Sequence, residues 1–284
     1  VLNEMKKKID DEKKKEKKLT KMWNEYIKNT HSKIERELEQ AYKTYLKQAK
    51  TRYIERIKEH VTNDKSFFTS EQKGMIVARE QLLSVLEEAR IQSEDIFDLW
   101  FKHWSLTGSQ ELDKVYRLAR KEKPLDLIFG FRELGKELFN DHALKVSRST
   151  ANIVMQYVEK GLEEGLAVED IALQLKTDTR LGFDSKRALR ISRTETTRIV
   201  SEATNKSYEL VVSDGINVKK QWLSARDNKV RPSHEELDGQ IVDINQNFVL
   251  PASMGGYEAS APSNFSVVGE NVNCRCTIIP VIED

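Results

Sequence analysis

The apolar residues between Trp23 and Ile57 recur at intervals of three, four and seven positions. This spacing places them on one face of an α-helix. No glycine or proline interrupts the chain before Gly74, so we expect one helix of about 35–40 residues, typical of a coiled coil or of a helix packed on a partner. The members of this apolar stripe are Trp23, Tyr26, Ile27, Ile34, Leu38, Ala41, Tyr42, Tyr45, Ala49, Tyr53 and Ile57.

Aromatic residues are frequent on the stripe. Tyrosine and tryptophan rings can stack on nucleic-acid bases, but rings at helical spacing more often belong to a core or an interface. We therefore interpret the stripe as a packing surface.

Helical patterns continue as far as Gly215. Thr69 and Ser93 are suitable N-caps for two of these helices. Trp100, Phe101 and Trp104 are expected to anchor the packing of the helices in this region. Residues 149–177 predict two helices joined between glycines 161 and 165. Residues 184–215 predict one long helix, because a glycine commonly ends a helix.

The pattern changes near Asn217. The last 68 residues hold four of the five prolines and four of the twelve glycines, and these residues break helices. Residues 216–225, 241–251 and 275–283 predict strands, with a long loop over 251–273. The fold class is therefore α+β, with a long, mainly helical N-terminal region and a small C-terminal α+β module that holds a short antiparallel sheet. We expect a basic helical arm over 1–68, a helical region over 69–144 and the module over 145–284.

Charge is unevenly distributed along the chain. The net charge is +1, but residues 1–60 carry 18 Lys and Arg against 11 Asp and Glu, so the remainder is slightly acidic. A basic arm suits contact with nucleic acid or an acidic partner, and a solvated lysine-rich helix face is the alternative. The candidate contacts are Lys6, Lys7, Lys8, Lys13, Lys14, Lys15, Lys17 and Lys18.

Targeting signals are not expected. No apolar run reaches the roughly 18–20 residues of a membrane span, and the first residues lack the apolar core of a signal peptide. Two cysteines cannot build a disulfide framework. These observations predict a soluble protein that is made in a reducing cytoplasm.

Candidate chemistry lies in three clusters near the C-terminus. "SRTETTR" contains Arg193, Glu195 and Arg198; "DNKVRPSHEELDGQ" contains Asp227, Arg231, His234, Asp238 and Gly239; "NVNCRC" contains Asn273, Cys274, Arg275 and Cys276. Within the second cluster, Asp227-Asn228 and Asp238-Gly239 are turn signals.

The two cysteines admit three interpretations. On a strand, Cys274 and Cys276 would point to one face, and with His234 they would offer three ligands of the kind that zinc prefers. A structural zinc normally has four ligands, so Asp227, Asp238 or a water would complete the site. Because C-x-C alone is a weak signal, a metal site, buried reduced thiols and a disulfide all stay open.

Cysteine, histidine and aspartate are also the residue types of acyl transfer, with a thiol nucleophile and His234 as base. Nothing places either thiol at a helix N-terminus or beside an oxyanion hole. A Cys/His-dependent hydrolase or transferase is therefore the less favoured alternative, and we expect no catalytic residues.

The ordered set R-T-E, W-x(4)-D-x(3)-R-x(2)-H-x(2)-L-D-G and N-C-R-C resembles the phage head morphogenesis domain, the Mu F-like minor head proteins of tailed bacteriophages. The resemblance covers roughly residues 145–282. The matching residues are Arg193, Thr194, Glu195, Trp222, Asp227, Arg231, His234, Leu237, Asp238, Gly239, Asn273, Cys274, Arg275 and Cys276.

The resemblance implies a virion protein held inside the capsid at the portal vertex after synthesis in the bacterial host cytoplasm. It implies roles in prohead assembly and DNA ejection, and no catalysis. The implied partners are the portal protein and double-stranded DNA bound non-specifically, with scaffold or major capsid protein as further candidates. No membrane contact is implied for the assembled head. Some relatives carry a toxin domain beyond this module, and none is expected here because the chain ends soon after Cys276.

The resemblance also bears on the metal. Some relatives have cysteines in place of Arg231 and His234, which gives a four-cysteine set typical of zinc. Here His234, Cys274 and Cys276 remain, so no cofactor is required by the pattern and zinc is the candidate. The same motifs allow a purely structural role in which Arg193 or Arg231 forms bidentate pairs with Asp227, Asp238 or Glu195.

The N-terminal 140 residues lie outside the resemblance. Their aromatic stripe could dock on the helical surface of a portal or self-associate, and their lysines could contact DNA phosphates. Lysine charge gives sequence-independent, salt-sensitive binding. We expect protein docking as the main role of the stripe and DNA contact as a second role of the lysines.

Overall fold

The computed structural model describes residues 2–63, 94–124, 168–178 and 182–282, together with scattered residues between 131 and 166. The chain forms two compact units. The first unit combines Val1–Leu38, Lys102–Gly135 and Arg190–Asp284, and the second combines Glu39–Phe101 and Lys136–Leu189. The predicted boundaries after residues 68 and 144 fall outside the described residues, so that division stays a prediction.

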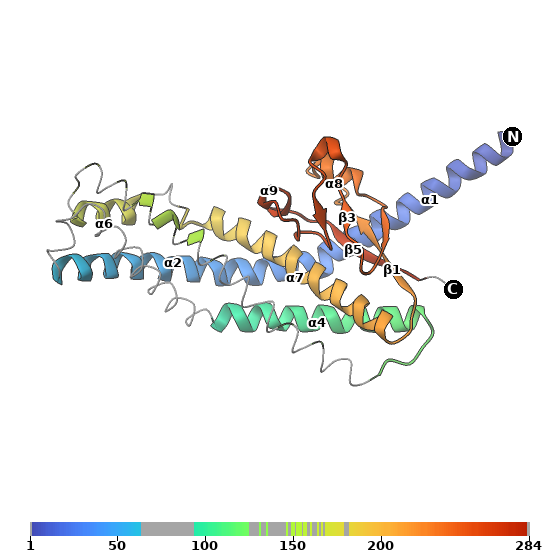
Figure 1. Ribbon diagram of the computed structural model, residues 1–284, viewed down its shortest axis with the longest axis horizontal. Coiled ribbons are helices and arrows are strands. Elements are labelled where there is room, and N and C mark those ends of the chain that lie inside the picture. Colours follow the sequence, from blue (N-terminus) through green and yellow to red (C-terminus); the bar gives the residue numbers. More distant parts are fainter. Residues whose placement is uncertain are drawn as a thin grey trace. The chain divides into compact units, whose positions relative to one another are not determined.

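The N-terminal stretch is helical throughout its described length (Figure 1). Helix α1 (Leu2–Tyr26) leads into a π-helical turn, η1 (Ile27–His31), and then into α2 (Ser32–Asn63). The predicted helix is confirmed and begins earlier than expected. The π turn within this helical run was not predicted.

The apolar stripe packs within the chain itself. Trp23, Ile34 and Leu38 are buried in the first unit, and Tyr42 and Tyr53 are buried in the second. This confirms packing as the role of the aromatic rings. These covered side chains offer no surface to a partner in this structure, and portal docking by the N-terminal helices stays a prediction.

Three further helices match the predicted pattern. They are α4 (Glu94–Leu118), α6 (Val168–Thr177) and α7 (Ser185–Ser213). Helix α4 begins directly after Ser93, which lies outside the described residues, as do Thr69 and the glycines at 161 and 165. Helix α7 ends as predicted: Gly215 has φ 79°, and the N–H of Ile216 bonds back to the carbonyl of Val211 at 3.2 Å.

The C-terminal part contains the antiparallel sheet that the sequence predicted. Strands β1 (Val218–Leu223), β2 (Ile241–Asp243) and β5 (Thr277–Ile282) have the order β2-β1-β5. In the register of the longer pair, Trp222 lies opposite Ile278. Between these strands lie the short helices α8 (Pro232–Glu236) and α9 (Val268–Asn271).

Two predictions for this part need correction. The single strand expected over 241–251 is two strands, because a turn follows Asp243; β2 joins the main sheet, and β3 (Phe248–Val249) pairs with β4 (Glu258–Ala259). The expected loop over 251–273 therefore contains β4, α9 and the 3-10 turn η4 (Ala252–Met254).

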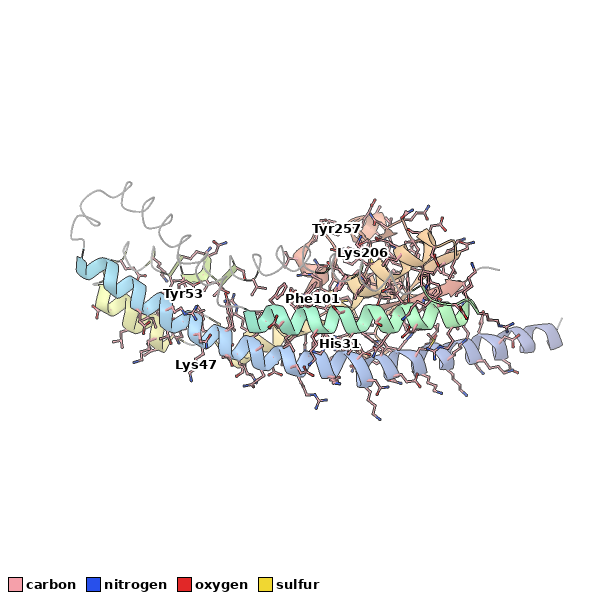
Figure 2. All side chains as sticks on the ribbon, turned by 90° about the horizontal axis from the view of Figure 1, so that it is seen from below. His31, Lys47, Tyr53, Phe101, Lys206 and Tyr257 are labelled. Atoms are coloured by element: carbon pink, nitrogen blue, oxygen red, sulfur yellow. The ribbon has the colours of Figure 1, made fainter. Side chains whose placement is uncertain are left out.

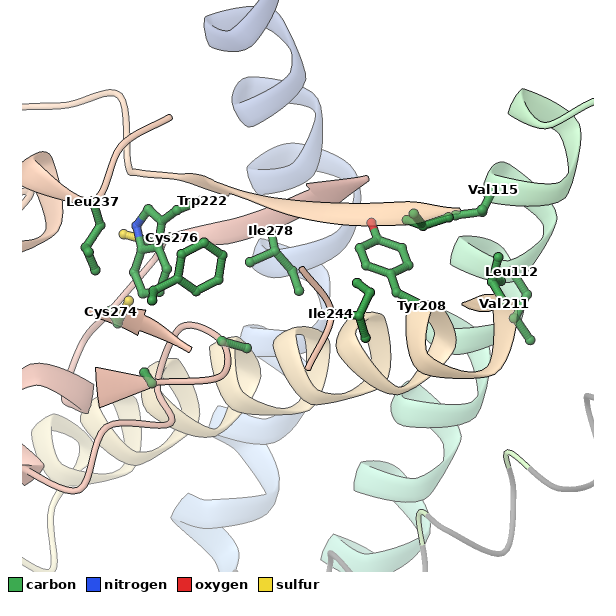
Figure 3. Close-up of a cluster of buried hydrophobic side chains, with 14 of the residues drawn as sticks. Leu112, Val115, Tyr208, Val211, Trp222, Leu237, Ile244, Cys274, Cys276 and Ile278 are labelled. Carbon is green, nitrogen blue, oxygen red and sulfur yellow. The ribbon is translucent and has the colours of Figure 1, made fainter. Parts of the chain in front are cut away.

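Both faces of the main sheet are covered. Trp222 and Ile278 belong to a core that includes Leu112 of α4 and Tyr208 of α7 (Figure 3). The next residue along each strand points the other way. Leu223 and Ile279 accordingly form a second cluster with Trp23 of α1, so this N-terminal helix supplies one layer of the C-terminal module.

The second unit has its own polar and aromatic contacts. Tyr53 of α2, labelled in Figure 2, lies edge-on to Phe183 with ring centroids 6.4 Å apart. The guanidinium of Arg187 lies 6.0 Å from the Phe183 ring and donates to Thr150 Oγ1 at 2.9 Å. Tyr157 donates to Asp178 at 3.1 Å.

Candidate functional site

The three C-terminal motifs meet in the first unit. The backbone N–H of Asn273 donates to Thr194 Oγ1 at 3.1 Å, and Thr197 donates to the carbonyl of Cys274. Both threonines lie on α7, in and beside the R-T-E motif. The structure therefore joins the first and third motifs directly.

At the centre of this meeting point lie His234, Cys274 and Cys276. The Nδ1 atom of His234 is 3.6 Å from Cys274 Sγ and 3.5 Å from Cys276 Sγ. The three side chains are 1%, 2% and 1% exposed. Both cysteines are free, so the structure contains no disulfide between them.

Local structure explains how these side chains come together. Pro232 opens the single turn of α8 after an extended Arg231, which places His234 on the inner side of that turn. Cys274 and Cys276 lie just before β5, and both sulfurs face His234 Nδ1, so the two side chains share one side as predicted. Asn273, with φ 58°, turns the chain immediately before them.

Aromatic rings enclose the histidine. The ring of Trp222 stands edge-on to His234 with centroids 5.6 Å apart, and Phe265 stacks on it at 5.7 Å. Figure 3 shows Trp222 beside both cysteines and Leu237. The imidazole is thus fixed in position by packing as well as by its polar contacts.

The carboxylate of Glu270, which the sequence analysis did not identify, faces the other ring nitrogen of His234. His234 Nε2 lies 3.1 Å from Glu270 Oε2, which also accepts from Ser233 Oγ at 2.8 Å. Glu270 lies on α9, inside the segment predicted to be a loop. With Nε2 facing Glu270, the Nδ1 atom is the one presented to the two sulfurs.

The surroundings shift the pKa values of the two thiols in opposite directions. Burial opposes ionisation of Cys274, but hydrogen bonds from Cys276 and His234 outweigh it and hold the pKa of Cys274 well below its ordinary value. Burial, reinforced by the neighbouring Cys274, raises the pKa of Cys276. The pair is therefore suited to hold one negative charge beside the imidazole.

The two aspartates considered as further metal ligands are engaged elsewhere. Asp227 forms a bidentate pair with Arg275, with N···O distances of 2.5 and 2.9 Å. Asp238 accepts from the backbone N–H of Ser224 at 2.8 Å and forms an ion pair with Arg226 at 2.8 Å. Neither aspartate belongs to the group of potential ligands formed by His234, Cys274 and Cys276.

The arginines of the motifs tie elements together with partners other than those expected. Arg193 pairs with Glu35 at 2.9 Å, and Glu195 pairs with Arg198 at 2.8 Å. Arg231 donates to the backbone carbonyl of Val272. The predicted structural role is present, but the predicted pairs were wrong because Glu35 comes from a distant helix and Arg198 lies one turn along α7.

The turns at Asp227 and Gly239 are fixed by hydrogen bonds, one of them to Trp222. Gly239 has φ 79°, and its N–H donates to the carbonyl of Trp222 at 2.9 Å. The Asp227 carboxylate accepts from the backbone N–H of Lys229 at 2.9 Å. These contacts fix the chain on either side of α8.

The three motifs lie within a segment that is similar to a known protein family. Residues 152–279 match a family described as Phage Mu protein F like protein. Over this segment, which is less than half of the chain, the sequence is similar to that family. The resemblance drawn from the three motifs is thereby confirmed.

Several curated proteins are similar to this chain. The Minor head protein GP7 of Bacillus phage SPP1 is 28% identical over 132 residues, which are 46% of this chain and 41% of that protein. The Enterococcus faecalis protein named NAD(+)–arginine ADP-ribosyltransferase EFV is 33% identical over 198 residues, which are 69% of this chain and 38% of that protein. YqbB of Bacillus subtilis is 29% identical over 137 residues, 48% of this chain and 43% of its own length.

The chain thus spans less than half the length of each of these relatives. No solved structure matches it.

The basic arm lies outside the Mu F-like segment. Lys13, Lys14, Lys15, Lys17 and Lys18 are exposed on α1. The more N-terminal lysines of the arm, Lys6, Lys7 and Lys8, lie in α1, but their side chains fall outside the described residues. Among the described helices, none has both the length and the hydropathy that crossing a bilayer requires.

Proposed function

We propose that this protein is a minor head protein of a tailed phage that binds the portal vertex and the packaged DNA and acts in prohead assembly and DNA ejection. The observation that carries the proposal is the Mu F-like match over residues 152–279, together with the similarity to the Minor head protein GP7. The proposed location is the inside of the capsid at the portal vertex.

The proposal includes no catalytic activity. The side chains with the chemistry for acyl transfer, His234, Cys274 and Cys276, are buried and contact one another. A nucleophilic thiol needs access to its substrate, and this burial argues against such access. The name of the EFV relative refers to a protein of which 38% aligns with this chain, so most of that protein lies outside the shared segment.

DNA contact is assigned to the lysines of α1. The exposed positions between Lys13 and Lys18 place several ammonium groups along slightly more than one helical turn. Such a surface neutralises phosphates without reading bases, and its affinity falls steeply with salt. Portal contact is assigned to exposed surfaces, because the aromatic stripe is buried within the chain.

Co-sedimentation tests both partners. The full chain is mixed with portal oligomers from the same gene cluster, and separately with double-stranded DNA at about 50 and 200 mM salt. We expect co-migration with the portal and DNA retention that is lost at the higher salt. If the chain sediments alone in both mixtures, the proposal fails.

Two matched variants test whether DNA binding depends on the lysines of the arm or on positive charge anywhere on the helix. K13Q/K14Q/K17Q removes three exposed lysines from the arm, and K28Q/K33Q/K47Q removes three exposed lysines further along the same helical run. The first variant is expected to reduce the salt slope of DNA binding by about one for each phosphate that is no longer neutralised. The second variant is expected to behave as the unaltered chain, and equal effects would contradict the assignment to the arm.

Transfer of ADP-ribose from NAD+ is measured on the same preparation. No turnover is expected with arginine as acceptor. Turnover that survives purification to homogeneity would overturn the non-enzymatic part of the proposal.

A further inference from the structure

We propose that His234, Cys274 and Cys276 bind a zinc ion that fixes α8 to the segment leading into β5. The three potential ligand atoms lie within 4.8 Å of one another. They come from two segments 40 residues apart in the sequence, so one ion would cross-link both.

The distances suit tetrahedral zinc. Zn–S bonds of about 2.3 Å and Zn–N bonds of about 2.0–2.1 Å at a tetrahedral angle give an N···S separation of about 3.6 Å. The two observed Nδ1···Sγ distances are 3.5 and 3.6 Å. Both N···S separations therefore match those of a single ion bound to His234 and each sulfur, and the two sulfurs lie within 4.8 Å of each other.

The histidine is held as a metal ligand requires. A ligating imidazole usually donates its second N–H to a carboxylate, which fixes the tautomer and raises the basicity of the ligand nitrogen. Glu270 Oε2 lies 3.1 Å from His234 Nε2, within ion-pair distance, and accepts a hydrogen bond from Ser233, but Nε2 itself makes no hydrogen bond in the structure. The carboxylate is thus within reach of Nε2, while Nδ1 faces the two sulfurs.

A cation would bind both sulfurs at once, whereas one imidazole nitrogen forms a good hydrogen bond with only one of them. The Nδ1 atom of a neutral imidazole has one lone pair and can accept one S–H well. Here Cys274 and Cys276 both approach it. A Zn²⁺ ion would satisfy both sulfurs as thiolates, and two thiolates with a neutral imidazole leave the buried centre without net charge.

The ligand types, two thiolates and one imidazole, also indicate which metal would bind. Thiolates and imidazole favour zinc over magnesium or calcium, which prefer oxygen ligands. With three protein ligands, a water molecule completes the coordination. The role is structural, because the cross-linked segment is the one that α7 holds through the Thr197 hydrogen bond to Cys274.

Metal analysis of the full chain is the first test. The protein is purified without chelator from zinc-supplemented cells, and the chelator-treated protein is titrated with Co²⁺. We expect about one zinc per chain and a thiolate-to-cobalt charge-transfer absorption. A ratio near zero together with no such absorption overturns the proposal.

Variants then assign the ligands. H234N and C276S should abolish the cobalt absorption, and E270Q should weaken zinc binding about 10–100-fold without abolishing it. H103N is the matched control, because His103 is likewise buried and lies 3.1 Å from a carboxylate, that of Glu37, but has no place in the ligand group. Zinc retained in H234N at the wild-type ratio contradicts the proposal. If a ligand variant fails to fold, the wild-type metal ratio and cobalt spectrum decide.

Discussion

The indole Nε1 of Trp23 in α1 donates a 3.2 Å hydrogen bond to the backbone carbonyl of Arg275, the residue between the two cysteines. The two residues are 252 positions apart in the sequence. The Trp23 ring also packs with Leu223 and Ile279 on the sheet face opposite the main core. The Mu F-like segment is therefore completed by a helix from the other end of the chain.

Loss of the Trp23 ring should loosen the sheet. W23A removes the packing and the hydrogen bond, so we expect a loss of about 3–5 kcal/mol in the free energy of unfolding. W23F keeps most of the packing and should cost about 1 kcal/mol from the missing hydrogen bond. Urea unfolding gives the energies, and hydrogen exchange of residues 274–279 locates the effect.

The matched control for this comparison is L106A, because the Leu106 side chain on α4 is 47% exposed. This substitution should change stability by less than about 0.5 kcal/mol. Unchanged exchange of residues 274–279 in W23A would show that α1 is not part of the module.

The bidentate pair between Arg275 and Asp227 should contribute to stability through its geometry. R275K keeps the charge but loses the fork, and D227N removes the charge. Both side chains are partly exposed, so we expect a coupling energy of about 1 kcal/mol in a double-mutant cycle. A coupling energy near zero would contradict this expectation and mean that solvent screens the attraction between Arg275 and Asp227.

Stability should rise between pH 8 and about 10.5 because of Lys220. Its ammonium is buried and donates to Asn205 Oδ1 and to the carbonyls of Ile244 and Ser260 at 2.8–3.0 Å. Burial, only partly offset by Glu209, lowers the pKa of Lys220 to about 8. Above that pH the unfolded chain holds a proton that the folded chain has released, so the free energy of unfolding increases.

The measurement is urea unfolding at several pH values, with K220M as comparison. K220M should lose the rise between pH 8 and about 10.5. It should also be less stable than the unaltered chain at pH 7, by about 1–3 kcal/mol, because the oxygens that accept from the ammonium lose their donor. An identical pH slope in both proteins would refute the role of Lys220.

Glu35 should stabilise the contact between the N-terminal helices and the R-T-E motif. Burial opposes its ionisation, but hydrogen bonds from His31 and Arg193 outweigh burial and hold the pKa of Glu35 below its ordinary value of 4.5. Its stabilisation is therefore present above about pH 4.5 and is lost as the pH falls through the lower, folded-state value.

At pH 7, E35Q should cost about 1–2 kcal/mol. E39Q, one turn further along the helix, removes an ion pair with Lys43, whereas Glu35 pairs with both Arg193 and the buried His31, so E39Q should cost less than about 0.5 kcal/mol. Acid unfolding midpoints measure both. A larger effect from E39Q would contradict the assignment.

The sequence predicted those features that depend on local pattern. The apolar repeat from Trp23 predicted the N-terminal helix, Gly215 predicted the end of α7, and the C-x-C spacing predicted that Cys274 and Cys276 face one side. Each of these is decided by residues within a few positions of one another.

Features that depend on distant contacts were missed. Lys220 alternates as a polar strand residue should, yet it is buried because α7 supplies Asn205 as a partner. Glu270 gave no signal within its loop, since its role depends on the folded position of His234. An acidic residue a few positions before the C-x-C motif is the one cue that could have pointed to it.

The central claim is that this chain is a structural component of the phage head. Its most direct test is quantitative mass spectrometry of proheads assembled from the complete head gene cluster and purified away from free protein. We predict that the chain is present at a few copies for each portal oligomer. Proheads that contain portal and major capsid protein but lack this chain would contradict the account.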